Sequence, residues 1–163
     1  MAGPSSESQF VTLALGDEVF AVSVAFVREI LDYQPPFAIP DGPPYLLGLT
    51  DVRGRGTPTI DLRLKLGMPS VPPGIATRIL VLDVPLADRV LSLGLVADRV
   101  IEVVSLAADQ IETAPDIGVP WRSDYIQGVV RRDTPDGGGG FVVIFDLARL
   151  LTSQDAAALA QAA

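Results

Sequence analysis

The sequence predicts an all-β protein built from two small lobes that share a core, and three observations carry this prediction. The chain consists mainly of short apolar stretches rich in β-branched residues, which are typical of strands. Its 14 prolines and 15 glycines separate these stretches at a spacing that fits small barrels better than helical bundles. Short motifs also recur in the same order in each half, which indicates a duplicated unit.

The predicted strands follow one another with turn residues between them. They cover Phe10–Leu15, Val19–Val24, Leu46–Val52, Thr57–Ile60, Arg78–Val84, Val90–Val96, Val100–Leu106, Ile126–Arg131 and Phe141–Phe145. Gly16-Asp17-Glu18 predicts a hairpin turn between the first two. Few helices are expected, namely one or two turns at Val24–Leu31 with Ser23 as N-cap, a short turn at Asp61–Leu66, and a tail that begins with Leu147–Leu151.

The internal repeat consists of three sequence matches. Each match is weak evidence alone, but all three occur in the same order in each half. The matches are Val27–Leu31 with Val100–Val104, Tyr45–Leu49 with Tyr125–Val129, and Ile60–Leu62 with Phe145–Leu147. Chance similarity between β segments is the alternative. A lobe of about 60 residues buries too little surface to be stable alone, so we expect the two lobes to pack together.

The repeat suggests where the lobes divide. We expect a single domain over 1–163, with a first lobe at about 9–68 and a second at about 75–151. The Pro/Ser/Gly-rich stretch Pro69–Gly74 is the natural join between them. Residues 1–8 are predicted to be a disordered tail, and 152–163 a C-terminal tail or helix.

Composition excludes several classes of function. The 163 residues include 20 acidic and 12 basic side chains, a net charge of −8 that disfavours nucleic-acid partners. Without cysteine or histidine, the chain has no disulfide, thiolate or imidazole metal site and no Ser-His-Asp triad. We therefore expect no metal and no cofactor. The N-terminus does not resemble a signal peptide, and no apolar run reaches the roughly 18 residues of a membrane helix, so a cytoplasmic location is expected.

The segment Val52-Arg53-Gly54-Arg55-Gly56 is the most informative one for function. Two arginines stand among glycines in an acidic chain whose only lysine is Lys65. A guanidinium binds carboxylates through two points, so Arg53 or Arg55 could be a recognition residue at the edge of a strand. The alternatives are a solvated hairpin arginine or an internal salt bridge, for example to Glu29 or Asp61. The segment lacks the spacing of a Walker nucleotide-binding loop.

The acidic residues leave two other hypotheses open. Asp61 and Asp146 each stand at a strand end before leucine, where a capping role is the simplest interpretation. A carboxylate-based enzyme would instead use Glu29, Asp61 or Glu102 as acid or base, and it needs two acids in one pocket. A small-ligand-binding barrel would need an enclosed apolar cavity.

From Phe10 to Leu151 the chain resembles the CheW family of bacterial chemotaxis coupling proteins. The motifs that carry the resemblance are Phe20–Val24 with Val27–Ile30, Ile39-Pro40 with Tyr45–Gly54, Pro58–Arg63 with Leu66-Gly67, Gly94–Val103, and Tyr125–Gly128. Two departures stand out. Asp51-Val52 replaces the family's Asn-Leu before Arg53, and Arg55-Gly56 replaces an apolar pair.

The resemblance implies a fold, a function and a site. The fold would be two SH3-like, five-stranded β-barrel lobes with a shared hydrophobic core and few short helices. The function would be a non-enzymatic adaptor that links the cytoplasmic hairpin tips of chemoreceptors to the regulatory domain of the histidine kinase CheA, with recruitment to receptor arrays. The family's contacts, carried over residue by residue, imply receptor binding by Val27, Glu29, Gly48, Arg53 and Gly54, with Val100 as a candidate kinase contact.

Overall fold

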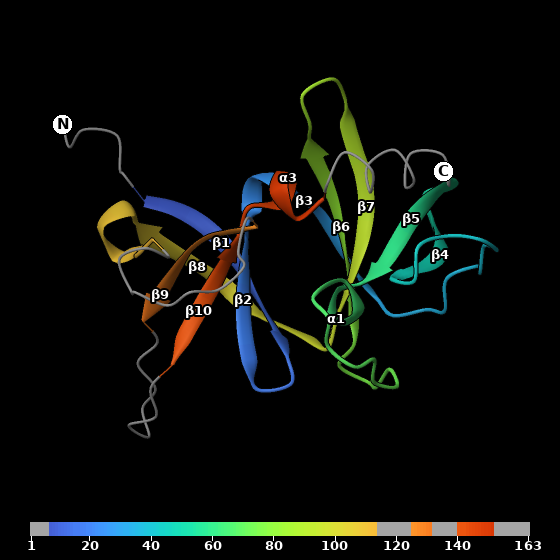
Figure 1. Ribbon diagram of the computed structural model, residues 1–163, viewed down its shortest axis with the longest axis horizontal. Helices are drawn as coiled ribbons and strands as arrows, with labels where there is room; N and C mark the ends of the chain where they lie inside the picture. Colours follow the sequence, from blue (N-terminus) through green and yellow to red (C-terminus); the bar gives the residue numbers. More distant parts are fainter. Residues whose placement is uncertain (1–6, 114–124, 132–139, 152–163) are drawn as a thin grey trace.

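The computed structural model describes residues 7–113, 125–131 and 140–151, and these residues form two five-stranded sheets (Figure 1). The sheet that we call the terminal lobe takes strands from both ends of the chain, β1 (Glu7–Leu15), β2 (Glu18–Ser23), β8 (Arg99–Ala107), β9 (Ile126–Arg131) and β10 (Phe141–Phe145). The central lobe takes the middle of the chain, β3 (Val27–Asp32), β4 (Leu46–Val52), β5 (Arg55–Asp61), β6 (Arg78–Pro85) and β7 (Val90–Ala97). The all-β prediction with two lobes is confirmed.

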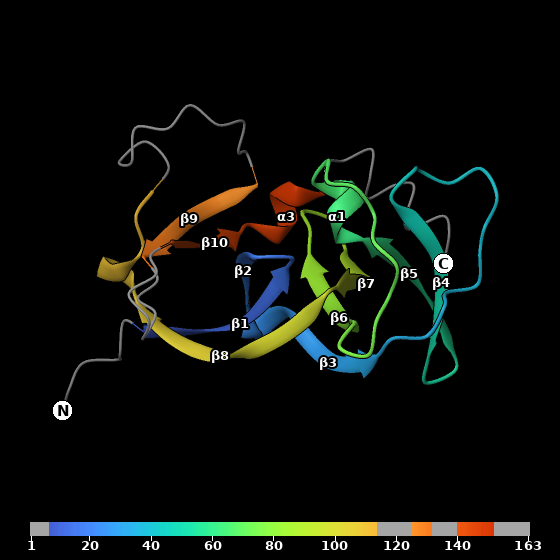
Figure 2. The ribbon, with the colours of Figure 1, turned by 90° about the horizontal axis from the view of Figure 1, so that it is seen from below.

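The two sheets have the same topology, which confirms the repeat. The strand order is β8-β1-β2-β10-β9 in the terminal lobe and β3-β6-β7-β5-β4 in the central lobe. Each pair of matching motifs occupies the same place, since β3 corresponds to β8, β4 to β9 and β5 to β10. Each sheet also has one parallel pair at the same position, β2 with β10 and β7 with β5. Figure 2 shows the corresponding strands β3 and β8 along one side of the molecule and the short helices α1 and α3 along the other.

The division of the chain into lobes at about 9–68 and 75–151 needs correction. The N-terminal hairpin β1–β2 pairs with β8, and Thr12 Oγ1 donates to the Glu102 carbonyl at 2.9 Å across 90 positions of sequence. Pro69–Gly74 follows α1 (Leu62–Lys65) and leads to β6 inside the central lobe, so it does not join the lobes. Alternation of apolar residues specifies a strand and its buried face but not its partner strand. For this reason the sequence alone predicts the β1–β2 hairpin in the wrong lobe.

The core has a large shared part and a smaller cluster inside each lobe. The shared cluster includes alternate residues of β1 and β6 such as Leu13 and Leu80, both fully buried. The Phe20 and Phe145 rings stack within it, with centroids 5.0 Å apart. Residues facing the other way line the lobe interiors, for example Phe10 in the terminal lobe. This alternation buries both faces of the innermost strands, and the shared cluster supplies the burial that a single small lobe lacks.

The helical predictions are confirmed in part. Val24–Leu31 is wrong as a helix, because only a 3-10 turn, η1 (Val24–Phe26), precedes β3. Ser23 nevertheless caps that turn, its Oγ accepting from the Ala25 N–H at 3.2 Å. Val27–Asp32 alternates half-buried and exposed residues, which is the period of a strand.

The later helical predictions are confirmed as far as the described residues extend. The aspartate caps are as expected, with Asp61 Oδ1 accepting from the Arg63 N–H at the start of α1. Asp146 does the same for α3 (Leu147–Leu150) through the Arg149 N–H. A second 3-10 turn, η2 (Ala108–Gln110), follows β8.

The predicted tails fall largely outside the described residues. Strand β1 begins at Glu7, so the expected disordered tail at 1–8 is too long by its last two residues. Residues 1–6 and the predicted tail at 152–163 lie outside the part of the chain that the structure describes.

Candidate protein-interaction site

Arg53 and Gly54 form the tip of the β4–β5 hairpin. Val52 pairs with Arg55, which leaves Arg53-Gly54 as a two-residue loop with φ values of 52° and 84°. Positive φ at both central residues is the pattern of a type I′ turn, whose twist suits an antiparallel hairpin. The Asp51 carboxylate accepts from the Gly54 N–H at 2.9 Å and closes the turn. The hairpin therefore presents Arg53 at the position where Asn is usually preferred.

Arg53 is paired with Glu29 on the opposite edge of the same sheet. Its Nε lies 3.2 Å from Glu29 Oε2, and Nη2 lies 3.5 Å from Oε1. Strands β3 and β4 are the first and last of the central sheet, so this pair links its two edges. The Glu29 side chain is 22% exposed and that of Arg53 is 77% exposed. Of the alternatives left open by the sequence, the salt bridge to Glu29 is the one that forms.

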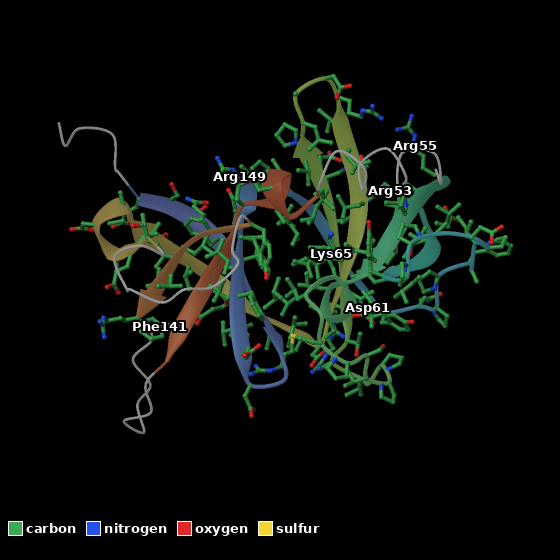
Figure 3. The ribbon with its side chains drawn as sticks, viewed as in Figure 1. Arg53, Arg55, Asp61, Lys65, Phe141 and Arg149 are labelled. Atoms are coloured by element: carbon green, nitrogen blue, oxygen red, sulfur yellow. The ribbon has the colours of Figure 1, made fainter. Side chains whose placement is uncertain are left out.

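Figure 3 places the other arginine and the other acid relative to this pair. Arg53 and Arg55 lie near one end of β5, and Asp61 lies at its other end beside α1. Asp61 is therefore not a partner of Arg53. Its second oxygen instead accepts from Ser70 Oγ at 2.9 Å.

Val27 and Gly48 occupy inner positions. Val27 pairs with Leu82 on β6, and its half-buried side chain packs against the shared core. Gly48 is buried with φ of 146°, and a Cβ added there would lie 2.0 Å from the Phe37 carbonyl oxygen. Gly48 thus lets the segment before β4 approach its backbone, and offers little surface to a partner. Of the predicted receptor contacts, the fold brings Glu29, Arg53 and Gly54 together.

Val100 lies on the terminal lobe. It pairs with Leu13 at a bulge between β1 and β8, and its half-buried side chain packs against the shared core. In the repeat it corresponds to Val27, and the two valines have the same partly buried environment on corresponding edge strands.

A groove next to the Arg53 turn was not foreseen from the sequence. Its volume is about 550 Å³, and it is lined by Leu31, Asp32, Gln34, Pro35, Phe37, Leu49, Thr50, Asp51 and Ile79. Phe37 is 77% exposed, although its backbone is fixed to Leu49 by hydrogen bonds of 2.7 and 2.8 Å. Asp51 belongs both to the groove and to the Arg53 turn. An aromatic residue within the run Pro35-Pro36-Phe37 was the available signal, since proline has no N–H to donate and therefore disfavours a regular strand at this point.

The acids proposed for a carboxylate enzyme have separate structural roles. Asp61 caps α1, and Glu29 is bound to Arg53. Glu102 is exposed on β8 in the terminal lobe, whereas Glu29 and Asp61 belong to the central lobe. Within the described residues, no group of three or more His, Cys, Asp and Glu side chains is placed to hold a metal ion. A search of the helices in the same residues finds none long and apolar enough to cross a bilayer.

Comparison with known proteins identifies the family. The model of the CheW-like domain matches residues 9–155. The chemotaxis protein CheW of Klebsiella aerogenes is 31% identical over 96% of this chain and 89% of its own length. CheW of Bacillus subtilis is 32% identical over 79% of this chain and 80% of its own. The scaffolding protein TtCheW from Thermoanaerobacter tengcongensis has a similar fold, with a TM-score of 0.77 at 21% identity over 94% of this chain and 93% of that one.

The sequence matches and the shared two-lobed architecture agree with each other. The chain belongs to the CheW-like family of non-enzymatic chemotaxis scaffold proteins.

Proposed function

We propose that this chain is a cytoplasmic adaptor that couples the hairpin tips of chemoreceptors to the regulatory domain of the histidine kinase CheA at receptor arrays. The receptor side would be the surface around the β4–β5 turn, with Val27, Glu29, Gly48, Arg53 and Gly54. Val100 and the terminal lobe would contribute to the kinase side. Family membership supports the adaptor class, and the geometry of Arg53 supports the placement of the receptor surface.

The exposed ion pair is the observation that carries this proposal. Glu29 fixes one side of the Arg53 guanidinium, and the side chain still remains 77% exposed. A held but accessible guanidinium loses less conformational freedom when it binds a second carboxylate or a carbonyl. Exposed arginines that are already oriented are common among the residues that dominate binding energy at interfaces.

The backbone at Arg53 supports a functional role as well. A residue other than glycine with φ near 52° costs of the order of 1 kcal/mol, and Asn or Gly would remove most of that cost. The Glu29–Arg53 pair is too exposed to offset it fully, because surface pairs contribute little. A strained arginine at a turn that favours Asn indicates that the side chain, and not the stability of the turn, is what the position requires.

The neighbouring groove fits the expected partner. A receptor tip is an antiparallel helical hairpin, and helices commonly dock by placing apolar side chains in a groove and charged ones on its rim. Phe37, Leu49 and Leu31 supply apolar walls, and Arg53 lies beyond Asp51 on the rim. Gly48 contributes by letting the Phe37 segment lie close to β4.

Arg53→Ala tests the proposal, with Arg55→Ala as its matched control. Both arginines belong to one hairpin and both substitutions remove one positive charge, but the bidentate contact with Glu29 is made by Arg53. We expect Arg53→Ala to weaken binding to a purified receptor cytoplasmic fragment by about 2 kcal/mol, roughly thirtyfold, and Arg55→Ala to have a much smaller effect. Binding to the CheA regulatory domain should be retained by both variants, as measured by calorimetry.

Two outcomes would contradict the proposal. Equal receptor binding by wild type and a folded Arg53→Ala variant would remove Arg53 from the receptor surface. Failure of the folded wild type to bind either the receptor fragment or the regulatory domain would remove the adaptor function itself.

A further inference from the structure

A second arginine–carboxylate pair lies at the junction of the two lobes. Arg63 Nε is 3.0 Å from Asp98 Oδ1, and Nη2 is 2.6 Å from Oδ2, so both arms of the guanidinium meet one carboxylate. The side chains are only 13% and 27% exposed. Bidentate pairs of this kind are strongly directional, and partial burial reduces screening by salt.

Asp98 stands where the chain passes from one lobe to the other. It separates β7 of the central lobe from β8 of the terminal lobe. Its Oδ2 accepts from the Gly16 N–H at 2.7 Å, and its own N–H donates to the Ala14 carbonyl at 3.1 Å. Both of these groups belong to the β1–β2 hairpin, so Asp98 is attached to the terminal lobe through its backbone and its side chain.

Arg63 is attached just as firmly to the central lobe. Its N–H donates to Asp61 Oδ1 at 2.9 Å at the start of α1. Its Nη1 donates to the Pro69 carbonyl at 3.4 Å, and Ser70 Oγ donates to Asp61 Oδ2. The Arg63–Asp98–Gly16 network therefore connects two rigid pieces of backbone, one in each lobe. We call this network the junction clamp.

Two other ion pairs connect strands within one lobe. Arg28–Asp83 and Arg78–Asp32 both join β3 to β6 in the central lobe. The Asp32 side chain is 91% exposed. Such a pair can affect the stability of its lobe but not the angle between lobes, which makes it a matched control for the junction clamp.

We propose that Arg63 is a positioning residue, and that through Asp98 it fixes the angle between the two lobes on which coupling depends. The shared core is held by apolar contacts, which are not directional, and a bidentate ion pair selects one orientation among those that the core would tolerate. The inference rests on the proposed adaptor function, in which the receptor and the kinase engage different lobes. A scaffold couples two partners only as far as the body between them holds them in a defined geometry.

The absence of native cysteine allows the angle to be measured directly. Cysteines introduced at Ser105 on β8 and Ala87 at the β6–β7 turn place one spin label on each lobe, both at exposed positions. We expect pulsed electron paramagnetic resonance to give a narrow distance distribution in the labelled wild type. Arg63→Met and Asp98→Asn should broaden it at a temperature well below unfolding, and Asp32→Asn should not. Arg63→Lys keeps the positive charge but not the two-armed guanidinium, and it should broaden the distance distribution less than Arg63→Met does.

The functional readout separates positioning from binding. In assemblies of receptor fragment and CheA, we expect Asp98→Asn to lower receptor-dependent stimulation of the kinase about fivefold or more. Its affinity for the receptor fragment measured alone should stay within about twofold of wild type, because the Arg53 turn lies at the opposite end of β5 from α1, which carries Arg63. CheA is present at saturating concentration, because the candidate kinase contact Val100 lies only two residues from Asp98. Arg63→Met should lower the stimulation similarly, and Arg63→Lys should retain more of it than Arg63→Met.

The possible results discriminate between the two proposals. An unchanged distance distribution in folded Arg63→Met and Asp98→Asn would overturn the clamp, whatever the partners do. A broadened distribution with full kinase stimulation would show that the lobe angle does not matter for coupling, and would overturn the inference while leaving the adaptor function intact. Absence of binding by the wild type would overturn the adaptor function and the coupling role together, and the distance measurement would still decide whether the clamp holds the lobes.

Discussion

Two arginines near opposite ends of strand β5 bind carboxylates in opposite ways. Arg53 reaches Glu29 from a strained turn and remains 77% exposed, whereas Arg63 holds Asp98 with both arms and is 13% exposed. The first pair combines a strained backbone with a side chain that is open to water, and the second is more buried and is tied by further hydrogen bonds to both lobes. The difference indicates that the Arg53 pair serves recognition and the Arg63 pair serves architecture.

The largest effect expected from this contrast is on stability. Arg63→Ala would leave the Asp98 carboxylate partly buried with only the Gly16 N–H as partner, so it should lower the free energy of unfolding by about 2–3 kcal/mol. Arg53→Ala should lower it by less than about 1 kcal/mol, because the pair that it breaks is exposed. Urea unfolding of the two variants measures both values. Similar losses in the two variants would remove the distinction drawn here.

Acid should weaken the Asp98 pair selectively. Hydrogen bonds from Arg63 hold the pKa of Asp98 below its ordinary value of 3.8, with the Gly16 N–H acting in the same direction against the opposing effect of burial. Since the folded state binds this proton less readily than the unfolded state, the stabilisation is fully present above 3.8 and is lost as pH falls through the lower folded pKa. Asp61 and Glu18 also face Arg63, and they help to keep it charged.

The measurement is the difference in unfolding free energy between wild type and Asp98→Asn as a function of pH. We expect this difference to be largest near neutral pH and to shrink below 3.8. Asp88→Asn is the matched control, because Arg89 lowers the pKa of Asp88 in an exposed pair that contributes little to stability. A difference for Asp98→Asn that is independent of pH would mean that the carboxylate does not act through its charge.

Much of the fold could be predicted from local patterns, and the rest depends on contacts between distant segments. Strands β4, β9 and β10 and the caps Asp61 and Asp146 follow directly from alternation and from aspartate at a strand end. Strand β3 was misread because Val27–Leu31 also fits a short helix. Its match to Val100–Val104, a predicted strand, was the signal against that interpretation.

The candidate site shows the same limit more sharply. The sequence could identify Arg53 and offer Glu29 as one partner, but only the folded sheet brings the Arg53 side chain from the β4–β5 turn to Glu29 on β3. The junction clamp joins residues 35 positions apart on different elements, and nothing local marks Arg63 and Asp98 as partners. Which strands pair is a global property, because it depends on what all the apolar faces can bury at once.

The finest test of the contrast replaces Arg53 with asparagine. Arg53→Asn and Arg53→Ala both remove the ion pair with Glu29, but Asn tolerates a φ of 52° and is favoured before glycine in a type I′ turn. We therefore expect Arg53→Asn to be about 0.5–1 kcal/mol more stable to urea than Arg53→Ala, and equally weak in binding the receptor fragment. Arg53→Lys keeps the positive charge and the strained backbone. It should therefore retain part of the receptor binding, and it should be no more stable to urea than Arg53→Ala. An Arg53→Asn variant that binds as wild type would mean that the shape of the turn, and not the guanidinium, forms the receptor surface.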